Sequence, residues 1–378
     1  MPVPTSPSSP LLDHFRDLED PRVEYLVNYY LLDIIGLTIC AVICGADTWV
    51  EIETYGRAKE EWLGQFLELP NGIPSHDTIA RLFAALDPEA LQKCFLRWVR
   101  SVAQLSAGTI IAIDGKTLRH SYDTGGGKGA IHMVSAWASQ NRLVLGQLKV
   151  AEKSNEITAI PELLQVLDLH GCIVTIDAMG TQKAIAEQII EAGGDYVLSL
   201  KGNQGHLHED VEQLFTWAPQ QAFQNIEHEF CQTLDGAHGR IEIRRHWLLG
   251  ETAHLIDADL WAGLQRVGLV ESERRLAGQP PTLERRYYLV SLDGGVEQFA
   301  QAVRSHWGIE NQVHWVLDVA FNEDASRIRK DHAPENLALV RHVALNLLRQ
   351  DAAAKGGIKN RRLRAGWDND YLLSLLAN

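Results

Sequence analysis

The chain has 378 residues, of which 46% are hydrophobic and 22% are charged, and its formal net charge is −14. This composition is that of an ordinary globular protein with room for two or three domains, and the net charge argues against a protein that coats nucleic acid non-specifically. The most apolar stretch, residues 31–45, contains Asp33 and is too short to span a bilayer, so a buried helix is expected there. No secretory signal is visible and the five cysteines lack metal-ligand spacing, which predicts a cytoplasmic protein with reduced thiols.

The basic residues are unevenly distributed. Residues 325–366 contain ten Lys or Arg and three acids, which gives a local charge of +7 (10 − 3) and leaves −21 (−14 − 7) for the remainder. A block of this kind is either a solvated face or a local contact surface for a polyanion.

The first 105 residues carry apolar side chains at helical spacing, which predicts an all-helical N-terminal domain over residues 1–105. Within the segment 74–86, Ser75 is the expected N-cap of a helix.

From residue 109 the periodicity switches to strands. The predicted strands are residues 109–114, 131–139, 142–150, 172–177 and 196–201, with a hairpin turn at Gln140 and Asn141; the predicted helices are residues 157–167, capped by Ser154 and Asn155, and 182–192. This β-β-β-α-β-α-β order predicts an antiparallel unit that leads into parallel α/β units. Residues 203–285 are interpreted as a β-rich insertion, followed by a strand at 287–292 and then by helices. The Gly-rich segment 125–130 is interpreted as a hairpin turn, because Gly129 stands where a phosphate-binding loop has Ser or Thr.

Two of the predicted strands, IIAID and IVTID, each end on a single aspartate, Asp114 and Asp177. An aspartate just past a strand often caps a turn, and this simpler explanation applies to either residue alone. On adjacent strands of an open sheet, however, the pair would share the crevice where such sheets bind ligands. Two close carboxylates repel unless a cation lies between them, and such hard oxygen ligands suit Mg²⁺ or Mn²⁺. Two such ions about 4 Å apart are the usual device for displacement at phosphorus.

Acids on the first and fourth strands, in this order of elements, predict an α/β fold with a ribonuclease-H-like mixed-sheet core. That fold takes a third acid from a late helix. The candidates are Glu310, Asp318, Glu323 and Asp324. Glu310 stands near the start of an amphipathic helix, where an acid also suits the helix dipole.

Several segments resemble the ISAs-type, or H-repeat-associated, DDE transposases over roughly residues 13–350. They are LEDPRVEYLVNYYLLDIIGLTICAVICGAD, GIPSHDTIARLF, DGKTLRHS, KSNEITAIPELL, TIDAMGTQ, GGDYVLSLKGNQ, HGRIEIRR and HWGIENQVHWVLDVAFNEDASRIR. The resemblance implies that Asp114, Asp177 and Glu310 are the catalytic and metal-binding residues, that two Mg²⁺ or Mn²⁺ ions are the cofactors, and that the protein cuts transposon ends and transfers the strand into target DNA.

Related DDE transposases place Tyr, Arg and Lys around the glutamate where this chain has Val303, His306 and Leu317, so Arg304 and Lys330 are expected to serve instead. Lys116 and Arg119 are equally well explained as a solvated loop, and Trp307 and Trp315 are expected to pack in the core rather than to stack on bases. The residues expected to contact DNA are Lys116, Arg119, Lys201, Asn203, Arg304, His306, Lys330, Arg361, Arg362 and Arg364.

The sequence therefore predicts a DNA transposase. Residues 1–105 would recognise DNA ends or dimerise, residues 106–350 would catalyse, and residues 351–378 would form a basic tail. The expected partners are transposon-end DNA, target DNA and a second copy of the chain, with no membrane and no small-molecule cofactor, and the protein would join the nucleoid when bound to DNA. Two alternatives stay open: an inactive DNA-binding remnant, and a metal-dependent nuclease without strand transfer.

Overall fold

The computed structural model describes residues 10–122, 129–150, 156–237, 240–276, 278–351 and 354–377. Of the expected features, the caps Ser154 and Asn155 and residues 125–128 of the Gly-rich turn lie outside the described residues. The Gln140–Asn141 turn is confirmed, since it joins two antiparallel strands.

Between residues 10 and 105, which are described without a gap, every element is a helix. Ser75 caps one of them as predicted, because its hydroxyl accepts the N–H of Thr78 at 3.4 Å. Thr48 and Glu51 form a reciprocal capping box at the start of another. The elements are α1 (Pro10–Asp13), η1 (Glu24–Leu26), α2 (Leu31–Ile43), α3 (Trp49–Leu63), α4 (His76–Ala85) and α5 (Pro88–Val102).

The apolar helix α2 is a core helix. Its single acid, Asp33, is buried and accepts the backbone N–H groups of Glu68 and Leu69 at 3.1 and 2.9 Å, which satisfies the carboxylate inside the protein. Among the described residues, none of the helices has the length and apolar character needed to cross a membrane.

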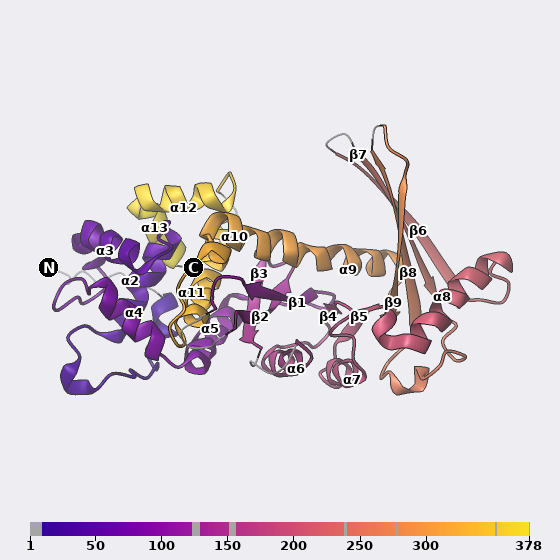
Figure 1. Ribbon diagram of the computed structural model, residues 1–378, viewed down its shortest axis with the longest axis horizontal. Helices are drawn as coiled ribbons and strands as arrows, with labels where there is room; N and C mark the ends of the chain where they lie inside the picture. The colour runs from indigo at the N-terminus through magenta and orange to yellow at the C-terminus, as the bar shows by residue number, and fades with distance from the viewer. Residues whose placement is uncertain are drawn as a thin grey trace.

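The described strands form one mixed sheet in the order β3-β2-β1-β4-β5-β9-β8-β7-β6 (Figure 1). In its first half β1 pairs antiparallel with β2 and parallel with β4, and β4 pairs parallel with β5. The predicted order of elements is therefore present. The strands are β1 (Ile110–Leu118), β2 (Ile131–Ala138), β3 (Leu143–Lys149), β4 (Ile173–Ile176) and β5 (Asp195–Leu200).

The predicted insertion extends the same sheet. The strand predicted after it, β9, begins within the insertion and pairs antiparallel with β5, and the other strands add to β9 as a meander that rises at the right of Figure 1. The first strand of this meander, β6, was not predicted. The elements are α8 (Gly205–Gln220), β6 (His228–Ala237), β7 (Arg240–Leu249), η3 (Ala258–Leu260), β8 (Arg266–Leu276) and β9 (Thr282–Val290).

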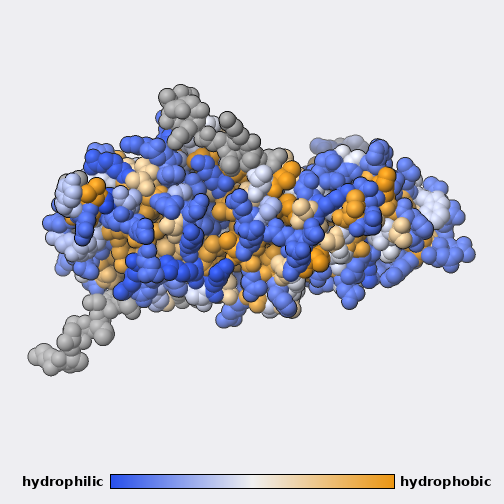
Figure 2. Space-filling model, turned by 90° about the horizontal axis from the view of Figure 1, so that it is seen from below, coloured by the Kyte–Doolittle hydropathy of each residue, from blue (hydrophilic) through white to orange (hydrophobic). Residues whose placement is uncertain are grey.

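Helices cover both faces of the sheet. On one face lie α6 (Glu156–Val166) and α7 (Lys183–Glu191), and Figure 2 shows this side of the molecule with hydrophilic and apolar residues interspersed. Along the other face runs one long helix made of α9 (Val296–Ile309), the π-helical turn η4 (Glu310–His314) and α10 (Trp315–Phe321).

The chain then returns to the N-terminal helices. Helix α11 is buried along almost its whole length and contacts α2, α4, α5 and β3, so the N-terminal helices share one core with the sheet. The predicted basic tail contains two helices that pack on this core rather than an extended segment. These last elements are η5 (Glu323–Ala325), α11 (Ala333–Gln350), α12 (Ile358–Trp367) and α13 (Asn369–Leu376).

Candidate active site

The three predicted acids line one pocket of about 370 Å³. Because β1 and β4 are parallel with Ile113 opposite Ile176, the residues that follow, Asp114 and Asp177, lie side by side where this pairing stops. The predicted end of the first strand at residue 114 is wrong, since β1 continues to Leu118 in its pairing with β2. The helix α9–η4 brings Glu310 to the same pocket from 133 residues (310 − 177) further along the chain. The structure thus brings together three acids that are far apart in the sequence.

Asp177 also does what an aspartate after a strand commonly does. Its Oδ1 accepts the backbone N–H groups of Met179 and Gly180 at 3.0 and 3.3 Å, which closes the turn after β4. Among the described residues no protein donor reaches its Oδ2. Capping the turn therefore fixes the carboxylate while leaving one oxygen facing the pocket.

Asp114 lies in an environment that disfavours its charge. Burial raises the pKa of Asp114 to about 7, against a donation from the Gly115 N–H that lowers the pKa. Repulsion from Asp177, Glu156 and Glu310 raises it further. The pocket therefore concentrates more negative charge than the protein itself compensates.

His306, which lines the pocket, and His314, which lies beside Asp114, are both held neutral. Burial lowers the pKa of His306 to about 4 and that of His314 to about 3. His306 Nδ1 lies 3.0 Å from the Thr175 hydroxyl, and His314 Nδ1 lies 3.6 Å from Asp114 Oδ2. His314 and Glu310 are the two ends of the π-helical turn, a feature that often marks functional sites.

The chemistry of the donors fits a divalent cation. Carboxylate oxygens are the ligands that Mg²⁺ and Mn²⁺ prefer, and a cation would relieve the repulsion that raises the pKa of Asp114. Within the described part of the chain, no three His, Cys, Asp or Glu side chains are grouped closely enough to hold a metal as they stand. Shared ligation by Asp114, Asp177 and Glu310 therefore requires their side chains to rotate toward one another.

The residue after Asp114 is a glycine, and the space around it explains why a small residue stands there. A Cβ on Gly115 would lie 2.5 Å from His132 Nε2 and would collide with the Glu156 carboxylate, because these two side chains are paired at 2.6 Å directly over the backbone there. A larger residue beside the first acid would have to displace this pair.

Lys116, expected to contact DNA, is instead held inside the protein. Its ammonium group donates to Glu323 Oε2 at 2.8 Å and to the Asp318 carboxylate, and only 11% of its side chain is exposed. Glu323 is buried and also lies 3.7 Å from Arg341. These contacts, the Lys116 cluster (Lys116, Asp318, Glu323 and Arg341), tie β1 to α10, which follows the turn that carries Glu310.

Some of the other predicted DNA contacts lie at or near the acidic pocket, and one lies elsewhere. Lys201 and His306 line the acidic pocket, and exposed Arg304 lies 3.9 Å from Asp235. Asn203 donates to the Ala178 carbonyl at 2.6 Å and so supports the turn after β4. Lys330 is not near these acids and lines a separate pocket.

The predicted arginines of helix α12 serve the fold. Arg361 donates to the carbonyls of Leu348, Asp351 and Ala354, and buried Arg362 donates to carbonyl oxygens and to Asp47. Because their donors bind groups within the protein, these two arginines are not among the proposed DNA contacts. Arg364 stacks on Tyr371 at 4.0 Å, and Arg119 lies 3.3 Å from Asp324.

The expected core packing of Trp307 and Trp315 is wrong, since these side chains are 38% and 60% exposed. Val303, Ile309, Val313 and Leu317 fill the buried side of this helix instead.

Strand β9 supplies pocket residues that sequence reasoning missed. Trp307 forms one wall of the acidic pocket, where the guanidinium of Arg286 stacks on its ring at 4.5 Å. Arg286 and Glu284, which it binds at 2.9 Å, both line the pocket. The alternation in LERRYYLV, which puts Arg286 on the same face as Tyr288, was the available signal.

The geometry defines a carboxylate pocket beside a mixed α/β sheet. Comparison of the chain with known proteins shows its family. Residues 105–347 match the transposase DDE domain and residues 12–99 match the DDE_Tnp_1-associated family. The chain belongs to the DDE transposase family.

The relatives narrow this family. The chain is 44% identical to the H repeat-associated putative transposase YhhI of Escherichia coli strain K12 over 97% of each chain. It is 45% identical to the putative transposase YncI of Escherichia coli O157:H7, over 97% of this chain and 94% of that one. A solved piggyBac transposase synaptic complex with hairpin DNA is similar at a TM-score of 0.46 with 11% identity, over 97% of this chain and 80% of that one.

Proposed function

We propose that the protein cleaves phosphodiester bonds at the ends of an insertion sequence and joins the freed 3′-hydroxyl to target DNA, with Asp114, Asp177 and Glu310 as its catalytic acids. The observation that carries the proposal is the meeting of these three acids in one pocket. The strand order β3-β2-β1-β4-β5, with the first two acids where the parallel pairing of β1 with β4 stops, supports a ribonuclease-H-like core.

The three carboxylates would hold Mg²⁺ or Mn²⁺, two ions in this proposal. When bound, such ions lower the pKa of an attacking water or hydroxyl and neutralise charge that develops at phosphorus. Binding also requires Asp114 to be ionised, so metal affinity should rise with pH up to about 7 and level off above it.

The remaining pocket residues would position the DNA. Lys201 and Arg286 are the cations that line the acidic pocket, and they are the proposed contacts for the phosphates on either side of the scissile bond. His306 is neutral because burial lowers its pKa to about 4, so it would act as a hydrogen-bonding partner rather than as a charge. The partners in this proposal are transposon-end DNA, target DNA and a second copy of the chain.

The test is a cleavage and joining assay on a duplex that carries the element's own ends, with Mg²⁺ as the added metal. Asp114→Asn, Asp177→Asn and Glu310→Gln should each abolish nicking while duplex binding in EDTA is retained. Double variants should be no worse than single ones, because the acids act as a unit. The matched control is Glu297→Gln, an exposed acid on the same helix as Glu310, which should cut normally.

Each other outcome decides between the alternatives. Binding without any nicking by the unmodified protein would identify an inactive remnant. Nicking without joining would identify a nuclease. Normal cutting by Glu310→Gln would remove Glu310 from the site.

A further inference from the structure

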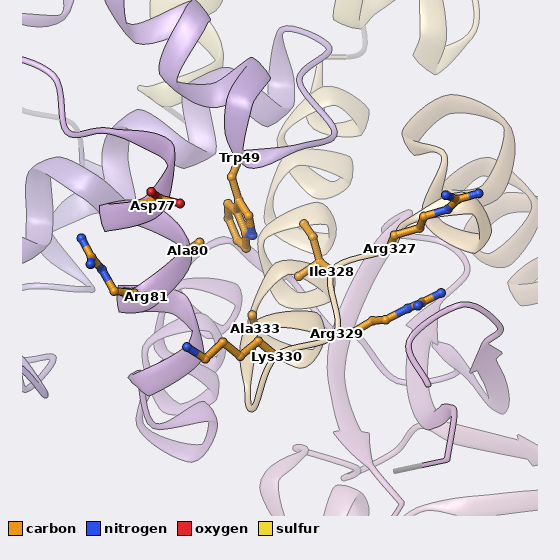
Figure 3. Close-up of a pocket in the computed structure, with 9 residues that line it drawn as sticks. All are labelled: Trp49, Asp77, Ala80, Arg81, Arg327, Ile328, Arg329, Lys330 and Ala333. Atoms are coloured by element: carbon orange, nitrogen blue, oxygen red, sulfur yellow. The ribbon is translucent and has the colours of Figure 1, made fainter. Parts of the chain in front are cut away.

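A second pocket lies between the N-terminal helices and the start of α11. It has a volume of about 620 Å³, and Figure 3 shows its two walls. One wall is helix α4 and the other is residues 327–330, with the indole of Trp49 between them. The lining residues, which we call the basic groove, are Trp49, Asp77, Ala80, Arg81, Arg327, Ile328, Arg329, Lys330 and Ala333.

The walls of the basic groove are fixed relative to each other. Asn336, in the first turns of α11, is buried and donates to the carbonyls of Phe83 and Leu86 at 2.9 Å each. The backbone N–H of His332 reaches the Ala84 carbonyl at 3.3 Å. These bonds hold the end of α4 against the segment that carries the cations, so the groove is preformed.

The charge of the groove is not compensated by the protein. It contains four cations and one acid, a balance of +3 (4 − 1), in a chain whose net charge is −14. Arg81, Arg327 and Lys330 are exposed, and none of the described carboxylates lies within 4.0 Å of them. Asp77, the acid, lies 3.6 Å from His76. Three unpaired cations in one groove indicate an anionic ligand from outside the chain.

The cations form a track rather than a cage. In Figure 3 Lys330 extends toward α4, where Arg81 stands, whereas Arg327 and Arg329 extend away from α4. Arg329 is held in this direction because its Nε donates to the His120 carbonyl at 2.8 Å and its guanidinium stacks on Tyr122 at 4.5 Å. Side chains that diverge along an open groove suit successive charges of a polymer better than one small anion.

Trp49 gives the groove an aromatic surface. Its ring packs on Phe83, with centroids 5.2 Å apart, and is therefore held in place. Cations beside a fixed aromatic ring are the combination that nucleic-acid-binding proteins use, because phosphates meet the cations and sugars or bases meet the ring.

A chain of side-chain contacts links the basic groove to the acidic pocket. Arg329 binds the carbonyl of His120, which follows strand β1, and Arg119 lies 3.3 Å from Asp324 beside the Lys116 cluster. That cluster in turn lies next to Asp114 through His314. The groove is therefore built on elements that are tied to those of the acidic pocket.

We propose that the basic groove binds the phosphodiester backbone of the DNA whose scissile phosphate occupies the acidic pocket, through Arg81, Arg327 and Lys330. The proposal rests on the proposed function for the identity of its ligand. Each contact should displace condensed counterions, so binding should depend on salt but little on base sequence.

The experiment measures duplex binding by the full chain in EDTA across a salt series, on both end-containing and unrelated duplexes. The variant R81Q/R327Q/K330Q should bind at least about tenfold more weakly on both duplexes, with a salt slope shallower by up to about 2.7, or 0.9 for each of three lost contacts. The matched control is K93Q/K355Q/K359Q, which removes three exposed cations outside the groove and should change neither quantity.

The outcomes separate this proposal from the proposed function. Equal slopes for the groove variant and the control overturn the groove, even if the unmodified protein cuts DNA. Groove-dependent binding by a protein that never cuts supports the groove and removes the catalytic proposal. Inorganic phosphate that competes with the duplex at far lower concentration than chloride of equal ionic strength would show a small-anion site and overturn the backbone assignment. Thermal unfolding of both triple variants checks that each is folded.

Discussion

Helix α12 and residues 327–330 are both rich in Arg and Lys, but the structure uses their charge in opposite ways. In α12, the guanidinium groups of Arg361 and Arg362 donate hydrogen bonds to backbone carbonyls, including that of Leu348 in the last turn of α11. In the segment 327–330, Arg327 and Lys330 are exposed and meet no described carboxylate. The first kind of cation stabilises the fold, whereas the second kind is free to bind a ligand. A sum of charges over residues 325–366 mixes both kinds.

The largest effect on stability is expected at Lys116, a cation held inside the protein. Lys116→Met leaves buried Glu323 and the neighbouring Asp318 without their shared partner. The free energy of unfolding should fall by up to about 3–5 kcal/mol, because Glu323 loses its hydrogen-bond donor and keeps only Arg341, which lies 3.7 Å away without a hydrogen bond. Urea denaturation measures this, with Lys359→Met on the exposed side of α12 as the control. A loss no larger than that of the control would mean that the Lys116 cluster is not structural.

Arg362 tests the comparison within α12 itself. Arg362→Met removes bonds to the Val42 carbonyl and to Asp47 and a stacking contact with Phe321 at 4.2 Å. We expect a loss of about 3 kcal/mol in the free energy of unfolding, because hydrogen bonds to charged groups contribute about 1.5–3 kcal/mol each. The salt slope of DNA binding by the folded variant should be unchanged. A shallower slope would place Arg362 among the ligand-binding cations and break the distinction.

The same comparison between a buried and an exposed charged residue can be made with acids, using Asp114 in the acidic pocket and exposed Asp293. The pKa of Asp114 is raised to about 7 in the folded protein, mainly by burial, so between about pH 4 and pH 7 the folded state binds more protons than the unfolded state. The metal-free protein should therefore lose stability as the pH rises through this window, by at most about 1.4 kcal/mol per pH unit from this group. Asp114→Asn should flatten the dependence in EDTA, and exposed Asp293→Asn should not. Identical profiles for all three proteins would show that Asp114 is not perturbed.

The smallest effect is expected at Arg364, which is exposed and pairs with Asp368 at 3.8 Å while stacking on Tyr371. Arg364→Gln should cost less than about 1 kcal/mol, because exposed pairs contribute little. It should leave the salt slope of DNA binding unaltered. A loss as large as that expected for Arg362 would mean that exposure does not separate the two kinds of cation.

The positions of the two aspartates were predictable because their signal is local. Asp114 and Asp177 each follow a β-branched apolar run, and parallel pairing of β1 with β4 makes the residues after such runs adjacent. Glu310 required the resemblance to a family, since nothing in its neighbourhood distinguishes it from Asp318. Strand β6 was missed because most of its side chains are exposed, so it lacks the apolar alternation that marks a half-buried strand.

The partners of the cations were not predictable from spacing. Lys116 lies two residues after Asp114, which suggests a shared role at the pocket, but its ammonium group binds Glu323, 207 residues later. Arg362 reaches the carbonyl of Val42, 320 residues earlier. Whether a cation is internal or exposed depends on such contacts between distant segments, and the local sequence carries no trace of them.

The π-helical turn between Glu310 and His314 decides which insertions and deletions the gene can tolerate. It is the only described stretch where the long helix departs from α-helical winding. Each residue of an α-helix advances about 100° around the axis, and a π-helical turn holds about one residue more than an α-helical turn. Deleting one residue inside this turn would therefore restore regular winding and leave the orientation of Asp318 toward Lys116 nearly unchanged. Deleting one residue in α9 or α10 instead would rotate everything that follows by about 100°. Length variation among relatives should therefore be absent from α9 and α10 while it accumulates in the strands β6–β8.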